Sequence, residues 1–125
     1  MNKKILLIED DDLIRDLYKR QLDLAGLSTD GYANGQTGLE ALHKAHYDLI
    51  LLDILLPDIN GLEILKQIKQ DPNTKTTPVV LLTNLGQDEI VKQGFNLGAE
   101  GYLIKLYYTP EKVIEEVRNI LGKQK

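Results

Sequence analysis

The stretch Leu49-Ile50-Leu51-Leu52-Asp53 places four consecutive apolar side chains directly before a carboxylate. A short apolar run without alternation is typical of a strand that is buried on both faces of a sheet. Two further runs have the same character, Ile5-Leu6-Leu7-Ile8 before this stretch and Val79-Val80-Leu81-Leu82 after it. Strands of this kind occur mainly in parallel sheets covered by helices on both sides, so the sequence predicts an α/β fold.

Helical patterns separate these strand-like runs. Apolar residues recur at three- and four-residue intervals, as on one face of a helix, in segments 14–25, 38–45, 62–68, 87–97 and 110–121. Residues 27–32 form a weaker, more polar strand that suits a sheet edge, and residues 102–104 form the last strand. The chain therefore contains five β-α units, and right-handed crossovers between them predict a doubly wound, five-stranded parallel sheet with five helices.

Length and composition restrict the class of protein. A chain of 125 residues fits one domain, and we expect a single domain over residues 1–125. The absence of cysteine excludes a disulfide framework, a thiolate metal site and a cysteine nucleophile. The net charge of −4 argues against direct nucleic-acid binding, because contacts to phosphates need clustered positive charge.

The hydropathy pattern argues against a membrane protein. No apolar run approaches the ~20 residues of a membrane span. The first apolar run, residues 5–8, is too short for a signal peptide and continues directly into acidic residues. We therefore expect a cytoplasmic protein without a membrane partner.

Polar side chains follow four of the predicted strands. They are the acidic run Glu9-Asp10-Asp11-Asp12, then Asp53, Thr83 and Lys105. The carboxyl ends of parallel strands meet at one edge of the sheet, where ligands of such folds bind. Crowded carboxylates raise one another's pKa, and a hard divalent cation with oxygen ligands, such as Mg²⁺, removes that penalty.

Asp53 is the strongest candidate for a reactive group at this edge. It follows the most apolar of the strands, which holds it rigidly. A carboxylate can accept a phosphoryl group as an acyl phosphate, and the protein's part in phosphoryl transfer is mainly to position groups and neutralise charge. The residues thus indicate a phosphoryl-accepting site at Asp53 with a divalent cation beside it.

The ordered set of residues over positions 3–121 resembles the receiver domain of two-component response regulators, the CheY-like family. The resemblance rests on the acidic pair after the first strand, on Asp53 with Pro57 and Gly61, on Thr83, and on Gly98-Ala99-Glu100-Gly101-Tyr102 leading to Lys105. It implies a flavodoxin-like fold with strand order 2-1-3-4-5. It also implies a phosphoryl-accepting switch rather than an ordinary enzyme, one that assists its own phosphorylation and its slow dephosphorylation.

The resemblance gives each candidate residue a role. Asp53 is implied to be the phosphoacceptor, and Lys105 to contact the phosphoryl group. The implied ligands of Mg²⁺ or Mn²⁺ are Glu9, Asp10, Asp53 and the main-chain carbonyl of Leu55. Thr83 is implied to be the switch hydroxyl and Tyr102 the aromatic side chain that reports its position.

The resemblance also implies partners. The phosphoryl group would come from a phosphohistidine on a sensor histidine kinase or a histidine phosphotransfer protein. Phosphorylation would alter the face made by residues 87–121, which would bind a downstream protein and could support a weak homodimer. The chain carries no recognisable output segment, and we favour a stand-alone receiver that acts by protein contact.

Three features depart from the family pattern. The acidic run is four residues long, so the metal pair could be Asp10 and Asp11; we prefer Glu9 and Asp10 because the apolar run ends at Ile8. The residue after Lys105 is Leu106 where the family usually has proline. Asn84 stands where a small residue commonly follows the switch hydroxyl, which would narrow access to the phosphoryl group.

A long-lived phosphorylated state is a further expectation. In receivers, the side chains two positions after the acceptor and two after the switch hydroxyl lie near the path of the attacking water. Here they are Leu55 and Leu85, and neither side chain can hydrogen-bond a water molecule.

Other functions remain open on the sequence alone. The pattern Asp10-x-Asp12 after an apolar strand is similar to that of haloacid-dehalogenase-type phosphatases, which form their aspartyl phosphate after the first strand. A flavodoxin-like cofactor binder would need a Ser/Thr/Gly-rich loop where this chain has four acids. An interaction module without phosphorylation is the third alternative.

Overall fold

A computed structural model describes residues 3–84, 88–105 and 109–122. Within these residues, five strands alternate with five helices. Their bounds are β1 Lys4–Ile8, α1 Asp12–Leu24, β2 Ser28–Tyr32, α2 Gly35–Lys44, β3 Leu49–Asp53, α3 Gly61–Gln70, β4 Val79–Thr83, α4 Asp88–Asn96, β5 Gly101–Ile104 and α5 Pro110–Gly122. All strands pair in parallel in the order β2-β1-β3-β4-β5. The α/β class, the strand order and the edge position of β2 are confirmed.

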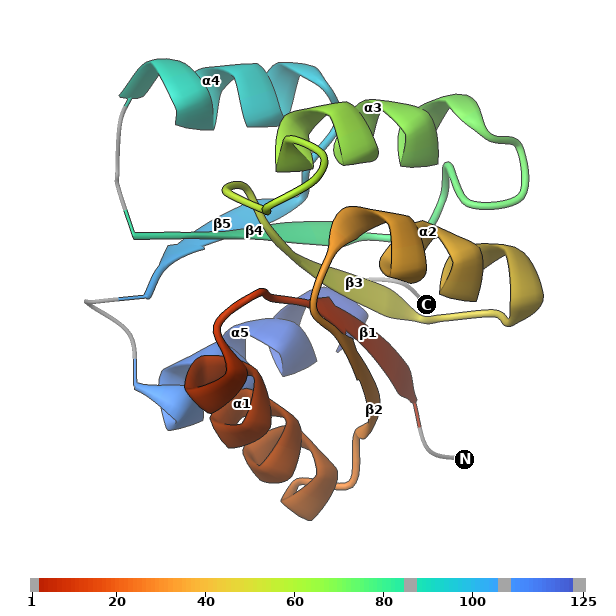
Figure 1. Ribbon diagram of the computed structural model, residues 1–125. Helices are drawn as coiled ribbons and strands as arrows, with labels where there is room; N and C mark the ends of the chain where they lie inside the picture. The colour runs from red at the N-terminus through yellow and green to blue at the C-terminus, as the bar shows by residue number, and fades with distance from the viewer. Residues whose placement is uncertain (1–2, 85–87, 106–108, 123–125) are drawn as a thin grey trace.

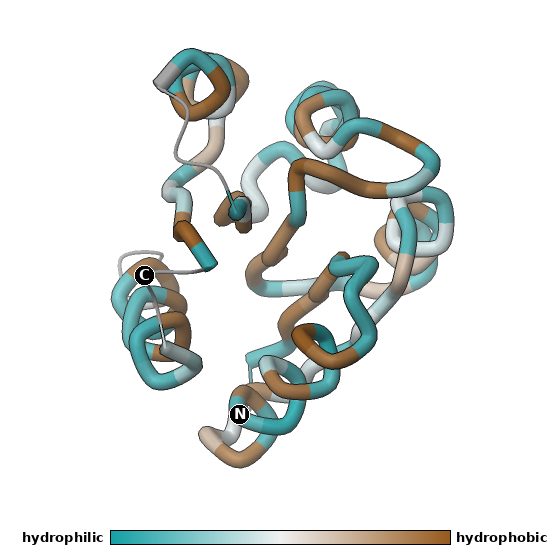
Figure 2. The backbone as a smooth tube through the Cα atoms, turned by 60° about the vertical axis from the view of Figure 1, so that its left-hand side comes forward, coloured by the Kyte–Doolittle hydropathy of each residue, from teal (hydrophilic) through white to brown (hydrophobic). Residues whose placement is uncertain are grey.

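The sheet forms the middle layer of three (Figure 1). Helices α2, α3 and α4 cover one face, and α1 and α5 cover the other. The apolar strands lie at the centre, and the helices turn their polar sides outward (Figure 2). None of the helices in the described residues has the length and hydropathy to span a membrane.

The run 49–53 shows why the central strands are apolar throughout. Ile50 and Leu52 belong to the core beneath α2 and α3, whereas Leu49 and Leu51 belong to the core beneath α1 and α5. All four side chains are fully buried. Alternate residues of this strand therefore fill the cores on the two faces of the sheet. A polar side chain is unfavourable at all four positions.

Helix α2 begins three residues earlier than the helical pattern predicts. The expected start was residue 38, and the helix starts at Gly35. The Asn34 side chain accepts a hydrogen bond from the Thr37 N–H, which caps the first turn. Asp58, from the loop after β3, accepts from the N–H groups of Gly35 and Gln36. A local sequence pattern cannot predict the cap that Asp58 provides, because Asp58 is distant in sequence from α2.

Candidate functional site

The strand register brings the predicted polar residues to one edge of the sheet. Ile8 of β1 pairs with Leu52 of β3, so the residues that follow them, Glu9 and Asp53, are neighbours. Across the other side of β3, Asp53 pairs with Leu82, the residue before Thr83. Thr83 in turn pairs with Ile104, the residue before Lys105. The four chain segments therefore present their polar side chains together.

A buried ion-pair cluster lies at the centre of this edge. The Lys105 ammonium contacts Glu9 Oε1 and donates to Asp53 Oδ2 over 3.1 Å. The side chains of Lys105 and Asp53 are each 5% exposed, and that of Glu9 is fully buried. One ammonium group thus faces two carboxylates away from water, which leaves a surplus of negative charge.

Burial and the neighbouring charges perturb the pKa values of both Asp53 and Lys105. Burial and the neighbouring Glu9 carboxylate raise the pKa of Asp53 to about 7, and the opposing effect of Lys105 does not cancel them. Burial acts to lower the pKa of Lys105, but Glu9 and Asp53 outweigh burial and raise it above its usual value. The ionised form of Asp53 is therefore costly until further positive charge arrives.

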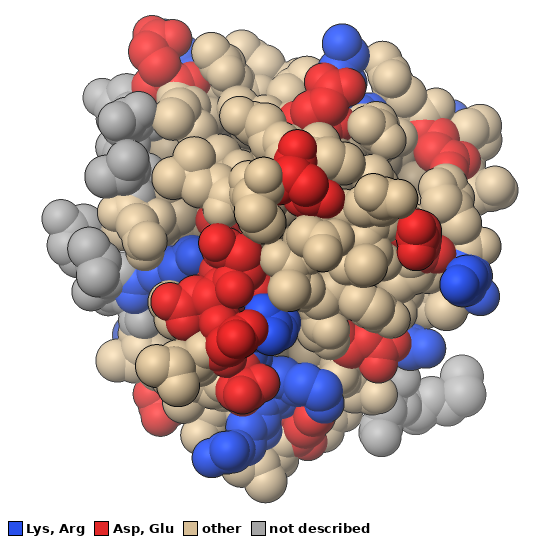
Figure 3. All heavy atoms as spheres, viewed as in Figure 1, with Lys and Arg blue, Asp and Glu red and all other residues tan. Residues whose placement is uncertain are grey.

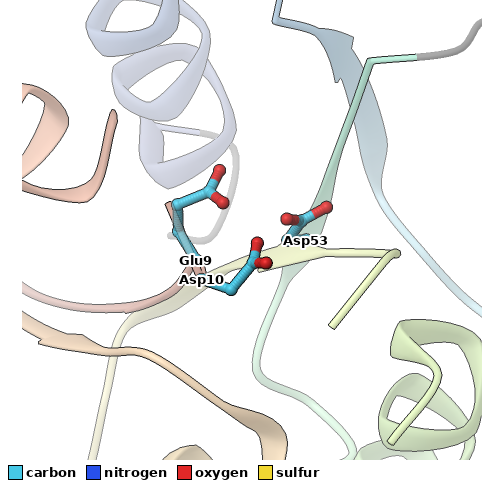
Figure 4. A group of neighbouring side chains, drawn as sticks. All are labelled: Glu9, Asp10 and Asp53. Carbon is cyan, nitrogen blue, oxygen red and sulfur yellow. The ribbon is translucent and has the colours of Figure 1, made fainter. Parts of the chain in front are cut away.

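Asp10 adds a third carboxylate to the cluster. One oxygen each of Glu9, Asp10 and Asp53 lie within 4.8 Å of one another. Asp10 is exposed and follows Glu9 just after β1, while Asp53 ends β3 (Figure 4). In Figure 3 acidic side chains gather on the face where the β1–α1 loop lies, with basic side chains beside them. Three converging carboxylates can hold a hard divalent cation such as Mg²⁺.

The last two acids of the run have other roles. Asp11 caps α1, because its Oδ1 accepts from the N–H groups of Leu13 and Ile14. Asp12 lies in the first turn of α1 and makes an ion pair with Arg15. These positions favour Glu9 and Asp10 over the alternative pair Asp10 and Asp11.

The loop after β3 is built around Asp53. Asp53 Oδ1 accepts from the Leu55 N–H over 3.2 Å, while the Leu55 side chain is 59% exposed. Gly61 opens α3 directly against β3, where a Cβ would overlap the Asp53 carbonyl oxygen. Its N–H donates to the Ile54 carbonyl over 2.7 Å. The spacing from Asp53 to Gly61 is thus a packing requirement of the site.

The expected switch residues lie on β4 and β5. Thr83 is buried at the end of β4, and Asn84 after it is exposed. Tyr102 is 38% exposed and stacks edge-on against Phe95 of α4, with ring centroids 5.9 Å apart. The expectations for Leu85 and Leu106 lie outside the described residues.

Two residues near the site were not predicted from the sequence. Asp58 receives hydrogen bonds from Gly35, Gln36 and its own neighbour Ile59, and these N–H groups lower its pKa. Arg15 donates to the Glu9 carbonyl. Nothing in the local pattern singles out Asp58, whereas the position of Arg15, a basic residue one turn after an acidic run, is a local signal for a contact with that run.

The comparisons with known proteins agree with this architecture. A family model described as the response regulator receiver domain matches residues 5–118. CheY4 of Vibrio cholerae, a chemotaxis response regulator, superposes with a TM-score of 0.90 at 28% identity, covering 96% of this chain and 99% of that chain.

Relatives of known sequence are longer. SilR of Salmonella typhimurium, described as a probable transcriptional regulatory protein, is 40% identical over 118 residues, which cover 94% of this chain and 50% of SilR. The transcriptional regulatory protein ResD of Bacillus subtilis is 34% identical over 118 residues, which cover 94% of this chain and 48% of ResD. The chain spans about half the length of these curated relatives.

Proposed function

This chain belongs to the family of response regulator receiver domains, the phosphoacceptor signalling switches of two-component systems, and we propose that Asp53 is the residue that accepts the phosphoryl group. One observation carries the assignment. Asp53 ends the central strand β3, and its carboxylate makes an ion pair with Lys105. It also shares a cluster of carboxylates with Glu9 and Asp10. An acceptor carboxylate needs this rigid support, a nearby ammonium and a place for a cation.

The cation in this proposal is Mg²⁺ or Mn²⁺. Its ligands are Glu9, Asp10, Asp53 and the main-chain carbonyl of Leu55. The oxygen-only donor set and its surplus of negative charge suit a hard divalent ion. When bound, the cation neutralises charge on the carboxylates and on the phosphoryl oxygens.

The remaining residues hold and read the phosphoryl group. Lys105 offers its ammonium to a phosphoryl oxygen, and the geometry beside Asp53 supports this role. The Thr83 hydroxyl binds another oxygen, with the exposed Asn84 beside it narrowing access. Movement of Thr83 changes the space available to Tyr102, so phosphorylation shifts the balance between two arrangements of the face made by α4, β5 and α5.

We further propose how the domain works in the cell. The chain is a phosphoacceptor that assists its own phosphorylation and slow dephosphorylation, and it is not an enzyme with an external substrate. The donor is a phosphohistidine on a sensor kinase or phosphotransfer protein, in the cytoplasm. The altered face binds a downstream protein. A stand-alone receiver and the receiver part of a longer regulator are both compatible with this proposal.

The test is phosphorylation by acetyl phosphate with Mg²⁺, followed by intact mass. The wild type gains the mass of one phosphoryl group. Asp53→Asn gains none, because an amide cannot form an acyl phosphate. The control Asp16→Asn, the same chemical change at an exposed position of α1, behaves as the wild type. Phosphorylation of Asp53→Asn to the wild-type level contradicts the assignment.

Asp10→Asn separates this proposal from the phosphatase alternative. In a receiver, Asp10 holds the cation, so the variant binds Mg²⁺ weakly and is phosphorylated slowly, yet its phosphoryl group is still on Asp53. In a dehalogenase-type phosphatase, Asp10 itself carries the phosphoryl group. An acyl phosphate on Asp10 of the wild type would support the phosphatase.

A further inference from the structure

Arg15 of α1 clamps the turn that carries the acidic pair. Its Nη1 donates to the main-chain carbonyl of Glu9 over 2.8 Å, and its Nη2 donates to Asp12 Oδ1 over 2.5 Å. The Arg15 side chain is only 18% exposed, although its partner Asp12 is 82% exposed. An arginine that is mostly buried while bridging two points of one turn is held in place by more than a surface ion pair.

The path of the Arg15 side chain depends on Gly31. A Cβ at position 31 of β2 would lie 3.2 Å from Arg15 Cγ and 3.3 Å from Cδ, closer than ordinary contact. The aliphatic stem of Arg15 therefore passes over a strand residue without a side chain. This contact directs the guanidinium toward the end of β1.

The Glu9 residue is fixed at four atoms. Its N–H donates to the Tyr32 carbonyl, its Oε2 accepts from the Asp11 N–H, and its Oε1 contacts Lys105. Arg15 holds the fourth atom, the carbonyl oxygen. That carbonyl belongs to the Glu9–Asp10 peptide unit, so its orientation determines where the Asp10 side chain leaves the backbone.

We propose that Arg15 is a positioning residue for the divalent-cation site: by holding the Glu9–Asp10 peptide it presents the Asp10 carboxylate beside Glu9 and Asp53. The inference rests on the proposed function, because it concerns the cation that the three carboxylates hold. Arg15 acts through the backbone and does not bind the ion. Residues that orient metal ligands typically change metal affinity about 10- to 100-fold when they are replaced.

A simple charge effect predicts the opposite result. The Arg15 guanidinium is a cation near a site for a cation, so removing its charge alone should tighten Mg²⁺ binding. Positioning predicts weaker binding even though a repelling charge is gone. The sign of the change therefore distinguishes the two explanations.

The experiment measures the Kd for Mg²⁺ by amide chemical shifts in the variants Arg15→Met and Arg15→Lys. Methionine keeps an apolar stem over Gly31 without the guanidinium, and lysine keeps the charge without the two-pronged donor. We expect Kd to rise about 10-fold in Arg15→Met, and by a smaller factor in Arg15→Lys. The matched control is Lys19→Met, which removes a positive charge one turn later on α1, where Lys19 pairs with Asp23. Its Kd should equal that of the wild type.

Hydrogen exchange in the metal-free protein gives a second readout. The N–H of Asp11, which donates to Glu9 Oε2, should exchange faster in both Arg15 variants and unchanged in Lys19→Met. An unchanged or tighter Mg²⁺ affinity in Arg15→Met, with unchanged exchange at Asp11, overturns the inference and leaves the proposed function intact. Failure of the wild type to bind Mg²⁺ overturns both.

Discussion

Lys105 lies at the carboxyl ends of the strands, here called the carboxyl edge of the sheet, and Lys69 lies at their amino ends, the amino edge. The two surroundings differ in charge balance. At the amino edge, Lys69 donates to the carbonyls of Thr77 and Lys75 and to Glu100 Oε1, so its three N–H groups meet one carboxylate and two neutral acceptors. The second oxygen of Glu100 accepts from the Val79 N–H over 2.6 Å. This cluster needs no further ligand.

The carboxyl edge is not balanced in this way. Lys105 faces two buried carboxylates, Glu9 and Asp53, and a third, Asp10, lies within ligand distance. An excess of buried negative charge destabilises a fold unless something compensates it. The ion pair of Lys69 is thus balanced within the protein, whereas the cluster around Lys105, the proposed site for a cation and a phosphoryl group, keeps a deficit of positive charge.

The largest expected effect is on the unbalanced edge. Asp53→Asn should raise the free energy of unfolding of the metal-free protein by about 2 to 3 kcal/mol at pH 8, because a costly buried charge is gone. The gain depends on pH. Since the folded pKa of Asp53, about 7, lies above the ordinary aspartate value of 3.8, the folded state binds more protons between these values, and wild-type stability falls as pH rises through this range.

Denaturant unfolding in EDTA from pH 4 to pH 8 checks the Asp53 prediction. The stability difference between Asp53→Asn and the wild type should grow with pH and level off above about pH 7. Asp16→Asn, at an exposed position of α1, should follow the wild type. A variant that is less stable than the wild type at pH 8 would show that the carboxyl edge is not strained.

The balanced edge should respond with the opposite sign. Glu100→Ala should lower the free energy of unfolding by about 2 kcal/mol, because hydrogen bonds to charged groups contribute about 1.5 to 3 kcal/mol. The lost partners are the Val79 N–H and the Lys69 ammonium. Glu100→Gln keeps one acceptor and should lose less. The phosphorylation rate should not change in either variant, and a large loss of phosphorylation would link the two edges.

A smaller effect is expected at Asp58, which lies in the loop after β3, five residues after Asp53. The N–H groups of Gly35, Gln36 and Ile59 lower the pKa of Asp58, whereas burial raises that of Asp53. Asp58→Ala should cost about 1 kcal/mol, as loss of a helix cap does. The contribution of Asp58 to stability is present above its unfolded pKa and is lost as pH falls through its lower folded pKa. The difference in free energy of unfolding between Asp58→Ala and the wild type should therefore disappear at acidic pH. Equal stability at neutral pH would contradict the capping role.

The smallest effect is expected on the lifetime of the phosphorylated state. Leu55 is 59% exposed beside Asp53, and an asparagine there could hydrogen-bond the attacking water. Leu55→Asn should therefore lose its phosphoryl group a few-fold faster, as followed by intact mass after the donor is removed. Leu24→Asn, at another exposed leucine, which lies at the far end of α1, is the control. Identical decay in both variants would exclude shielding by Leu55.

Local signals account for what the sequence predicted. The unbroken apolar run before Asp53 reflects burial on both faces of one strand, so the strand and the end residue could both be read directly. The same holds for Thr83, which ends β4, and for the residues that follow β1 and β5. Parallel pairing then converts an order along the chain into a cluster in space.

Long-range contacts account for what the sequence did not predict. Asp58 caps a helix 22 residues earlier in the chain, through Gln36. Glu100 accepts a hydrogen bond from the N–H of Val79, 21 residues away in sequence, and another from Lys69, 31 residues away. Arg15 acts through the space that Gly31 leaves open. No periodicity or spacing encodes these partners, because each depends on how separate elements meet.

The most direct test of Asp53 as the phosphoacceptor is to locate the phosphoryl group in the wild-type chain. Borohydride reduces an aspartyl phosphate to homoserine, and peptide mass mapping then identifies the modified position. After treatment with acetyl phosphate and Mg²⁺, we predict homoserine at position 53 and aspartate at position 10. Homoserine at position 10, or a phosphorylated chain with Asp53 unmodified, would contradict this prediction.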